Sequence, residues 1–338
     1  MSEVNRLNYI GSKHQLIDWI FGHIQERTGW TNFDSKNIAD LFSGTGIVSW
    51  NLRIRGASTA SNDSELYSAT VTEAFARSVY NDNIEKTIKS LNSVEDGVDG
   101  FVTRNFSPFE TCERMFFTVE NARRIDWIRG KIEEMRPDLS ADEYTFLVAS
   151  LVVSADAVSN VPAVYGMFLK QFKQKAMKKL VLKPIHTRTL PAHAHVTNTD
   201  VLQQQWGPFD ATYLDPPYNE RQYSKNYFPL NIIAMSPEVA ARQTLHGKTG
   251  IPQGSFVSPF CQKKKAEQAF DSLFENITSK WIFLSYNSES LLSKDKMLEI
   301  MRRHGEASVI EADYKRFKSF DYNADKPIKE FLFSLQKL

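Results

Sequence analysis

The stretch NIADLFSGTGIVSWNLRIRGASTASND, residues 37–63, decides the fold of this 338-residue chain. Its first residues, NIADLF (37–42), form a short apolar run that predicts a strand, and the SGTG that follows predicts a tight turn. IVSWNLRIR then has the pattern of a helix, and ASTASND (57–63) predicts a second strand that ends on an acid. A strand, a glycine turn, a helix and a strand in this order form a βαβ unit, so we expect a parallel sheet.

The rest of the chain divides into two kinds of sequence. Residues 85–190 predict mainly helices, and we include the basic stretch 169–188 among them. Short apolar strands resume after this region, at HVTNTDV (195–201), DATYLD (210–215), WIFLSYN (281–287) and FLFSL (331–335). We therefore expect an α/β domain formed by residues 1–84 and 191–338, interrupted by a mainly helical subdomain at 85–190.

The composition is that of an ordinary folded protein, with 42% hydrophobic and 24% charged residues. The two cysteines, Cys112 and Cys261, form no disulfide framework and no CxxC metal pair, which favours a reducing compartment. The N-terminal residues have no apolar core of signal-peptide length, and no stretch approaches the roughly 20 apolar residues of a membrane span. We expect a cytosolic protein that does not enter a membrane.

The formal net charge of +1 conceals an uneven distribution of charge. Residues 169–188 carry seven lysines and arginines without one acid, and smaller basic clusters occur in QKKKAE (262–267) and YKRFKS (314–319). A lysine run can be simply a solvated helix face. Three clusters on a nearly neutral chain favour a polyanionic partner instead.

The glycine turn indicates a ligand that contains a nucleoside. Gly44 and Gly46 at a strand end permit a tight turn and a close approach of a ligand to the backbone. The phosphate-binding GKS or GKT is absent, and Ser49 stands where the dinucleotide pattern has its third glycine. Asp63 ends the next strand, close to the roughly 20-residue offset at which an acid binds ribose hydroxyls. These features predict a nucleoside-bearing cofactor that needs no pyrophosphate.

The stretch TYLDPPYNERQY (212–223) places the carboxylate of Asp215 at the end of a predicted strand, where open α/β sheets bind ligands. Pro216 and Pro217 restrict the backbone and fix the direction of its carbonyls. A carboxylate beside a backbone carbonyl can accept both hydrogens of one exocyclic amine, while the ring of Tyr218 can stack on a base. A proline-rich loop with a core tyrosine is the alternative, but a nucleoside site earlier in the chain favours the functional interpretation.

Together these motifs resemble the Dam-like, adenine-specific DNA methyltransferases that use S-adenosyl-L-methionine. NYIGSK (8–13) is similar to the family's N-terminal cofactor motif, and DLFSGTG (40–46) to its glycine loop. ASND (60–63) is similar to the strand that carries the ribose acid, and NTDV (198–201) to the adenine-contacting turn. DPPY (215–218) is similar to the catalytic signature. Their order implies the family's alpha arrangement, in which the insertion is the target-recognition subdomain. RMFFTVENARRID, VYGMFLK, DPPYNERQY and LSYN further resemble a subgroup of type II restriction-modification enzymes that includes the FokI kind.

The resemblance implies roles for individual residues. The catalytic residues would be Asp215, Pro216, Pro217 and Tyr218. The cofactor would be bound by Tyr9, Gly11, Lys13, Asp40, Phe42, Ser43, Gly44, Gly46, Asp63, Asp200 and Val201. DNA would be contacted by Arg221, Tyr223, Lys225, Lys170, Lys173, Lys178 and Lys179. The family often has a larger aromatic residue at the position of Tyr9, a difference that we expect to alter cofactor affinity rather than chemistry.

The fold implied is a Rossmann-like S-adenosylmethionine-dependent methyltransferase sheet with an inserted, mainly helical target-recognition subdomain. The reaction implied is methyl transfer to the exocyclic N6 amine of an adenine flipped out of double-stranded DNA, without a metal. The resemblance also implies a bacterial or phage protein of the cytoplasm, with a possible cognate restriction endonuclease, working as a monomer or weak dimer.

Three alternatives stay open at this point. The same fold can methylate RNA or a protein amide, although Asp215 and the long insertion favour adenine in DNA. An inactive DNA-binding module is a second alternative, against which the intact Gly44, Asp63 and Tyr218 argue. A nicotinamide dehydrogenase is a third, but the glycine loop is incomplete and no general acid or base is evident.

Overall fold

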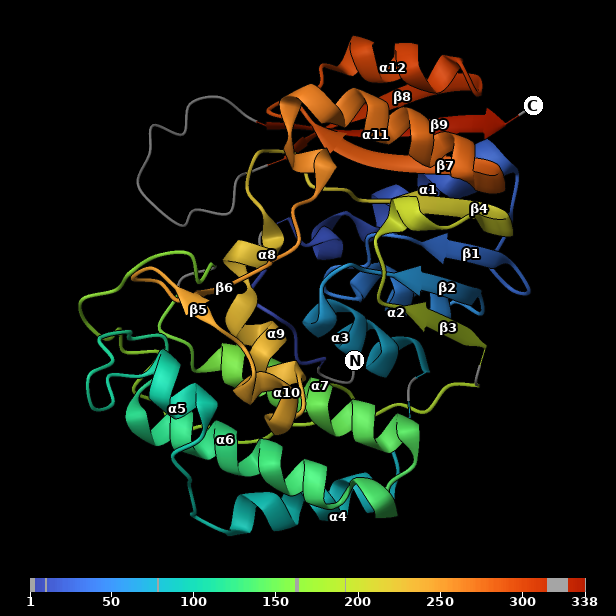
Figure 1. The fold of residues 1–338 in the computed structure, drawn as a ribbon. Coiled ribbons are helices and arrows are strands. Elements are labelled where there is room, and N and C mark those ends of the chain that lie inside the picture. Colours follow the sequence, from blue (N-terminus) through green and yellow to red (C-terminus); the bar gives the residue numbers. More distant parts are fainter. Residues whose placement is uncertain are drawn as a thin grey trace. The chain divides into compact units, whose positions relative to one another are not determined.

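The structure is a computed structural model that describes residues 4–9, 11–77, 79–161, 164–191, 193–314 and 328–337 (Figure 1). The chain divides into two compact units. The helical unit consists of Met1–Gly11, Glu65–Ala192 and Tyr223–Ser255. The sheet unit consists of Ser12–Ser64, His193–Gln222 and Phe256–Leu338. Each unit therefore combines segments that are far apart in the sequence.

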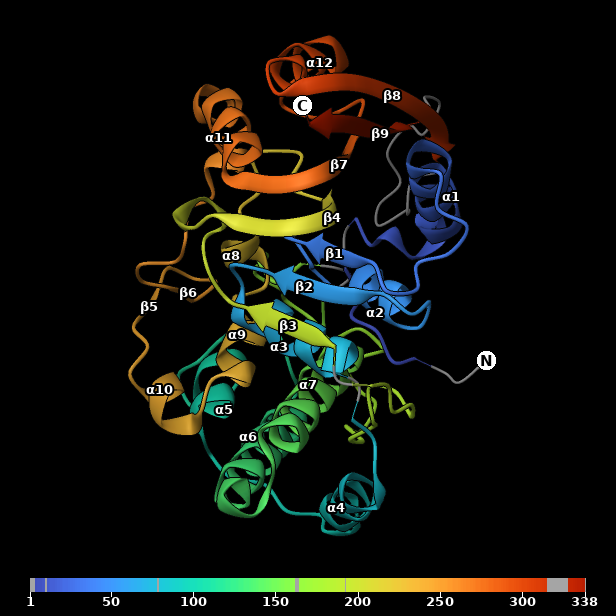
Figure 2. The ribbon, with the colours of Figure 1, turned by 90° about the vertical axis from the view of Figure 1, so that its right-hand side faces the viewer.

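A seven-stranded sheet forms the centre of the sheet unit. Its strand order is β3-β2-β1-β4-β7-β9-β8, which the reader can follow in Figure 2. Strand β9 is antiparallel to β7 and β8, and the other neighbouring strands are parallel. The strands are β1 (Asn37–Asp40), β2 (Ser58–Asn62), β3 (Ala194–Thr197), β4 (Trp206–Leu214), β7 (Ile277–Asn287), β8 (Gly305–Tyr314) and β9 (Ile328–Lys337). The predicted α/β fold is confirmed, with helix α2 (Ile47–Arg53) between β1 and β2.

The order of the strands reverses at β1. The chain runs from β1 to β2 and β3 on one side, and then returns to place β4 and β7 on the other. Asp40 at the end of β1 lies opposite Tyr213 of β4, and the backbone N–H of Leu41 donates to the Tyr213 carbonyl at 3.2 Å. Parallel sheets bind ligands at the carboxyl ends of the strands where the order reverses. The glycine turn after β1 and the prolines after β4 both start at this edge.

Helices cover both faces of the sheet. Besides α2, the sheet unit contains η1 (Lys13–Leu16), α1 (Ile17–Thr28), η3 (Val201–Gln203), η4 (Pro259–Cys261), α11 (Lys263–Asn276) and α12 (Lys294–Arg302). On one face, Phe270 of α11 and Ile300 of α12 pack in one core with Ile282 of β7. On the other face, His23 of α1 meets Phe283 with ring centroids 6.3 Å apart. Consecutive residues of β7 therefore point to opposite faces, as the alternation of a strand requires.

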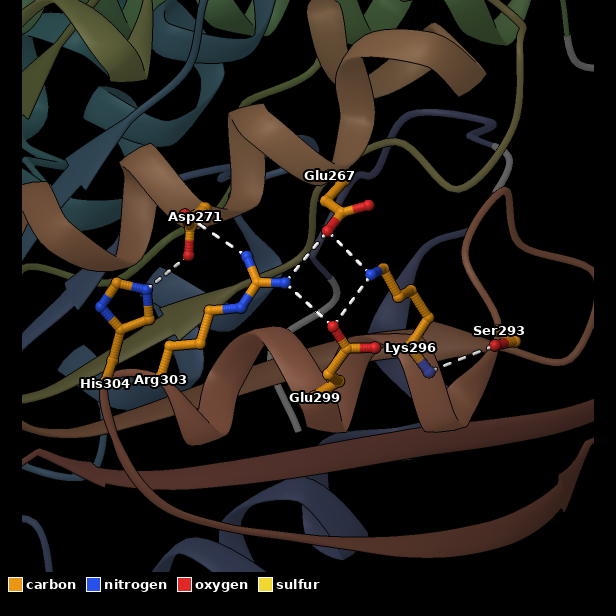
Figure 3. Close-up of polar contacts among 7 residues, drawn as sticks. All are labelled: Glu267, Asp271, Ser293, Lys296, Glu299, Arg303 and His304. Carbon is orange, nitrogen blue, oxygen red and sulfur yellow. Dashed lines mark hydrogen bonds and ion pairs between the residues drawn. The ribbon is translucent and has the colours of Figure 1, made fainter.

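A charged network fastens α11 to α12 above this core. Figure 3 shows its members, Glu267, Asp271, Ser293, Lys296, Glu299, Arg303 and His304. The guanidinium of Arg303 contacts Glu299 at 3.0 Å and Glu267 at 3.1 Å. Lys296 contacts the same two carboxylates at 3.0 Å and 2.8 Å. Because these side chains are substantially exposed to water, we expect the apolar core beneath them to contribute more to stability.

The helical unit is built around helix α7, whose residues 146–156 are all buried. Its elements are α3 (Leu66–Arg77), α4 (Asp82–Ser93), α5 (Phe101–Phe106), α6 (Val119–Glu134), η2 (Arg136–Asp138), α7 (Ala141–Ala157), α8 (Tyr223–Asn226), α9 (Phe228–Ala234) and α10 (Pro237–Ala241), with a small hairpin of β5 (Leu245–His246) and β6 (Ile251–Pro252). Helices α3, α6 and α9 all pack against α7. The unit thus includes residues on both sides of the 85–190 region.

The basic stretch, residues 169–188, contains no helix, so this part of the sequence prediction is wrong. Its backbone instead binds side chains of the neighbouring helices. Asn121 of α6 donates through Nδ2 to the carbonyls of Ala176 and Lys178, at 3.2 Å and 2.9 Å. Its Oδ1 accepts from the N–H of Leu180 at 2.9 Å. These bonds satisfy backbone groups that a helix would have paired internally.

Two further asparagines hold the basic stretch in the same way. Asn92 donates to the carbonyl of Leu182 at 2.8 Å and accepts from its N–H at 3.0 Å. Asn160 donates to the carbonyl of Gln171 at 3.0 Å and accepts from the N–H of Lys173 at 2.7 Å. The backbone of the stretch is therefore fixed against the helices.

Candidate active site

The glycine turn after β1 is tied to the end of β2. Gly44 and Gly46 have φ angles of 53° and 71°, in the left-handed region that favours glycine. The N–H of Gly44 donates to Oδ2 of Asp63 at 2.8 Å, and the N–H of Ser43 donates to the carbonyl of Asn62 at 3.0 Å. The structure therefore brings together four of the predicted cofactor residues, Ser43, Gly44, Gly46 and Asp63, and the bond to Asp63 explains how an acid at the end of the second strand fixes the turn.

Asp40 is a buried acid at the same edge, with 1% of its surface exposed. Its Oδ2 accepts from the hydroxyl of Ser49 at 2.6 Å and from the Ser49 N–H at 3.1 Å. Among the described residues, its Oδ1 is buried without a hydrogen-bond partner. Burial raises the pKa of Asp40 to about 7; the Ser49 hydroxyl opposes this rise, and the charges of Asp215 and Asp63 add to it. Ser49, at the position of the missing third glycine, thus serves to bind Asp40.

Asn62 joins the end of β2 to the NTDV turn. Its Oδ1 accepts from the N–H of Thr199 at 3.2 Å and from the Thr197 hydroxyl at 2.8 Å, and its Nδ2 donates to the Thr199 carbonyl at 3.1 Å. Asp200 follows and caps η3, and Val201 is buried. We did not single out Asn62 from the sequence; an amide at the end of a buried strand is the signal that could have identified it.

Phe42 is held by the sheet unit itself. Its ring is partly exposed and packs edge to face on Phe260 of η4, with centroids 5.2 Å apart and an interplanar angle of 86°. The predicted cofactor residue Phe42 therefore has a fixed ring that still reaches the surface beside the glycine turn.

Tyr9 and Gly11 belong to the helical unit, where Tyr9 lies in a cluster of tyrosines. The Tyr9 ring stacks on Tyr227 at a centroid distance of 4.8 Å, and Tyr223 lies 5.5 Å from Tyr9. Tyr67 completes the cluster, at 5.6 Å from Tyr227. The structure thus brings Tyr9, a predicted cofactor residue, together with Tyr223, a predicted DNA contact.

The carboxylate of Asp215 lies between a lysine and a tyrosine just beyond the end of β4. Lys13, with 3% of its side chain exposed, places Nζ 3.0 Å from Oδ1 of Asp215. The hydroxyl of Tyr218 donates to the same oxygen, and Lys13 donates to that hydroxyl. Burial raises the pKa of Asp215, and the positive charge of Lys13 opposes this rise. The resemblance implies a cofactor role for Lys13, and the structure shows that its ammonium also contacts the catalytic signature.

The rest of the signature is fixed from the side of β7. The ring of Tyr218 meets that of Tyr286 edge to face, with centroids 5.5 Å apart, and the Tyr218 carbonyl accepts from the N–H of Leu291 at 2.9 Å. Pro216 is buried and Pro217 is half-buried. Since 19% of the Asp215 side chain is exposed, the acid stays accessible while the neighbouring Tyr218 is held by these contacts.

Glu330 of β9 is a buried acid that the sequence prediction missed, and it interacts electrostatically with Lys13 and Asp215. From the sequence, FLFSL (331–335) predicts only a strand. The signal that could have identified Glu330 is a charged residue next to an apolar run on a strand that packs inside a sheet.

The predicted DNA contacts lie in different parts of the chain, and all of them except the half-buried Tyr223 are exposed. Arg221 is exposed in the sheet unit, and Lys225 is exposed on α8 of the helical unit. Four exposed lysines of the basic stretch are Lys170, Lys173, Lys178 and Lys179, the last of which pairs with Glu95. The cluster at 262–267 begins α11, whereas residues 315–319 of the third basic cluster lie outside the described residues.

The described ranges contain neither a candidate metal site nor a candidate membrane span. No group of three or more histidine, cysteine, aspartate or glutamate side chains in those ranges could hold a metal ion. No helix in the described part of the chain is long and apolar enough to cross a membrane.

Residues 9–300 match the family model of the D12 class N6 adenine-specific DNA methyltransferases. The chain is 38% identical over 333 residues to the type II methyltransferase M.CviAII of Paramecium bursaria Chlorella virus 1, covering 98% of both proteins. It is 35% identical to the type II methyltransferase M.NlaIII of Neisseria lactamica, covering 93% of both. It is also 33% identical to the type II methyltransferase M.FokI of Planomicrobium okeanokoites, covering 98% of this chain and 53% of that protein.

Proposed function

Because this chain belongs to the D12 class N6 adenine-specific DNA methyltransferase family, we propose that its residues 215–218 hold the target adenine. The family's reaction is methyl transfer from S-adenosylmethionine to the N6 amine of adenine in DNA. The observation that carries the proposal is the position of Asp215. It follows directly after β4, at the same edge of the sheet at which the glycine turn follows β1. An acid at this point can bind an amine next to a bound cofactor.

The residues around the glycine turn fit the cofactor. The left-handed turn at Gly44 and Gly46 lets a ligand approach the backbone, and Oδ1 of Asp40, which has no partner in the described part of the chain, offers a buried acceptor. In this proposal Asp63 binds the ribose hydroxyls, and residues 200–201 flank the adenine of the cofactor. Phe42 and Ser43 lie beside its methionine part, with Lys13, Tyr9 and Gly11 as further cofactor contacts. When bound, S-adenosylmethionine supplies a methyl group on a positively charged sulfur.

The protein's contribution to the chemistry is to bind and orient the amine. The carboxylate of Asp215 and the carbonyl of Pro216 accept the two hydrogens of the N6 amine, which favours a tetrahedral nitrogen and stabilises the developing positive charge. Holding the amine in line with the methyl group supplies much of the remaining rate. Stacking on Tyr218 returns about 1–3 kcal/mol of the few kcal/mol needed to flip the base out of the duplex.

We assign DNA binding to two sets of residues. Within the proposed target-recognition subdomain, residues 85–190, the lysines of the basic stretch contact phosphates, which gives affinity without sequence information. Arg221, Tyr223 and Lys225 follow the catalytic signature and contact DNA near the flipped base. Reversing two charges, in Lys178→Glu with Lys179→Glu, is expected to weaken binding equally on all sequences and to flatten its salt dependence. If the dependence of DNA affinity on salt concentration, measured by filter binding, is unchanged, these lysines do not contact phosphates and are simply exposed to solvent.

The biological setting is a further part of the proposal. The relatives from Chlorella virus and Neisseria, which this chain matches over nearly their whole length, are type II methyltransferases. This similarity supports a role beside a cognate restriction endonuclease. Two free cysteines and a DNA substrate support the cytoplasm of a bacterium or an infected cell. We propose a monomer or weak dimer, which light scattering across a concentration series can test.

The experiment that tests the proposed function uses purified protein, S-adenosylmethionine and unmodified double-stranded DNA of mixed sequence. Modified bases are then mapped by long-read sequencing, with structured RNA added as a competitor in a parallel reaction. The proposal predicts N6-methyladenine at one short motif and little effect of the RNA. Modification of the RNA instead of the duplex would contradict the DNA assignment.

A further inference from the structure

Glu330 is a carboxylate at a place where strands are otherwise apolar. It stands on β9, opposite Asn287 of β7 and Ala312 of β8, and Phe331 and Leu332 follow it. Only 6% of its surface is exposed. A charged group is seldom buried on an inner strand without a partner, because its removal from water is costly. Glu330 therefore needs a specific explanation.

The charges that face Glu330 come from the catalytic signature and from η1. Burial raises the pKa of Glu330; Lys13 lowers it and the negative charge of Asp215 raises it again. Asn287 is its hydrogen-bonding neighbour on β7. Even so, Oε2 of Glu330 is buried without a hydrogen-bond partner among the described residues. One ammonium, that of Lys13, thus interacts with two carboxylates, and no described residue satisfies Oε2 of Glu330.

The arrangement around Asp215 creates a difficulty for base binding. Oδ1 of Asp215 already accepts from Tyr218 and lies 3.0 Å from Nζ of Lys13. A carboxylate whose charge is offset by an ammonium at this distance is a weaker acceptor for an incoming amine. Lys13 must therefore give up part of its contact when the base enters. Because Lys13 is almost completely buried, its ammonium is favourable there only if another acceptor replaces the part of the contact that it gives up.

We propose that Glu330 is a positioning residue for methyl transfer: it is the second acceptor of Lys13 and leaves Asp215 available to the adenine amine. In the absence of DNA, Lys13 binds Asp215 and Tyr218. When the base binds, the ammonium shifts towards Oε2 of Glu330 and remains neutralised, and Asp215 keeps its negative charge for the amine. The inference rests on the proposed role of residues 215–218.

The test compares Glu330→Gln with wild-type protein by single-turnover methyl transfer at saturating cofactor and DNA. Glutamine keeps the shape of the side chain and removes its charge. We expect the rate to fall at least about tenfold, less than the roughly 10²–10³-fold loss typical of a group that contacts the reacting atoms directly. The dissociation constant of S-adenosylmethionine, measured by calorimetry, is expected to stay within about twofold, since the affected step follows cofactor binding.

The pH profile separates positioning from a merely structural role. Other ionisable groups near Glu330 are Tyr213, Asp215 and Tyr218, and the charge of Asp215 in turn raises the pKa of Asp40. In the wild type, acid protonates Glu330, whose pKa is raised, and the rate falls. The Gln variant has no carboxylate to protonate at this position. In its profile of rate against pH, the acidic fall in rate is therefore expected at lower pH than in the wild type, and the maximal rate is expected to be lower. Identical acid limbs in the two proteins would overturn the proposal.

Glu311→Gln is the matched control, because Glu311 is an exposed carboxylate on β8 that pairs with Lys294 and Lys329. It is expected to keep the wild-type rate. Glu330→Asp retains the charge on a shorter side chain and is expected to have a rate between those of the wild type and the Gln variant. If the Gln variant does not fold, a wild-type rate in the Asp variant overturns the proposal. Absence of adenine methylation by the wild type would refute the proposed function and this inference together, whereas equal rates in wild type and Glu330→Gln would refute only the role of Glu330.

Discussion

Replacing Asn121 with alanine tests whether asparagine side chains hold the basic stretch in place. Asn121 has 4% of its surface exposed and makes three side-chain hydrogen bonds, to the backbone of Ala176, Lys178 and Leu180. The substitution removes all three partners at once. It changes no charge, so an effect on the stretch can be attributed to these bonds.

The expected magnitude follows from the number of bonds. Each buried hydrogen bond contributes about 1 kcal/mol net, so the three bonds of Asn121 stabilise the closed arrangement by about 3 kcal/mol. Since 1.4 kcal/mol is a factor of ten, the opened population is expected to rise about 100-fold.

Limited trypsin digestion measures this opening directly, because the stretch is rich in lysine. When opening and closing are fast relative to cleavage, the cleavage rate follows the opened population. We expect cleavage after Lys173 and Lys178 to become about 100-fold faster in Asn121→Ala, and DNA affinity to fall because the phosphate contacts are no longer ordered. Asn83→Ala is the control, since Asn83 is itself exposed and its side chain bonds Glu143 rather than the basic stretch. Unchanged cleavage in Asn121→Ala would refute the reasoning.

Three further predictions concern the sheet unit. Burial raises the pKa of Asp40 to about 7. The protonated acid therefore stabilises the fold fully below the ordinary pKa of an aspartate, and this stability is lost as pH rises through about 7. The free energy of unfolding is expected to fall by about 4 kcal/mol over this range. Asp40→Asn should remove this loss in urea unfolding at about pH 5 and pH 8, and an unchanged pH dependence would contradict it. Asn62→Ala should weaken S-adenosylmethionine binding about tenfold in calorimetry, because the turn at Thr199 loses its hydrogen bonds; wild-type affinity would argue against this role. Arg303→Ala should lower the melting temperature more at low salt than at high salt, because its partners are exposed. A shift independent of salt would exclude an electrostatic origin.

The features that the sequence predicted correctly are those with local signals. The βαβ unit of residues 37–63 depends on an apolar run, a glycine turn and a helical period, all within a few residues of one another. The structure places Asp215 at a strand end for the same reason, because the two prolines stop the strand immediately after it.

The features that the sequence did not predict depend on distant partners. The basic stretch has helical composition, but Asn92 binds it from 90 residues away, and this tertiary contact overrides the local preference. Glu330 lies more than 300 residues from Lys13, so no spacing rule connects the two. Long-range pairing of β9 with β7 sets the place of Glu330 in the sheet, and its interaction with Lys13 of η1 exists only in the folded chain.

The most direct test of the central claim is single-turnover methyl transfer by Asp215→Ala on a duplex that the wild type modifies. The account predicts that transfer falls by at least about 10²-fold, because the acceptor of the amine is removed, while cofactor and DNA binding persist. Calorimetry and filter binding on the same preparations establish that both ligands still bind. Wild-type transfer by Asp215→Ala would contradict the account, because it would show that this carboxylate does not bind the reacting amine.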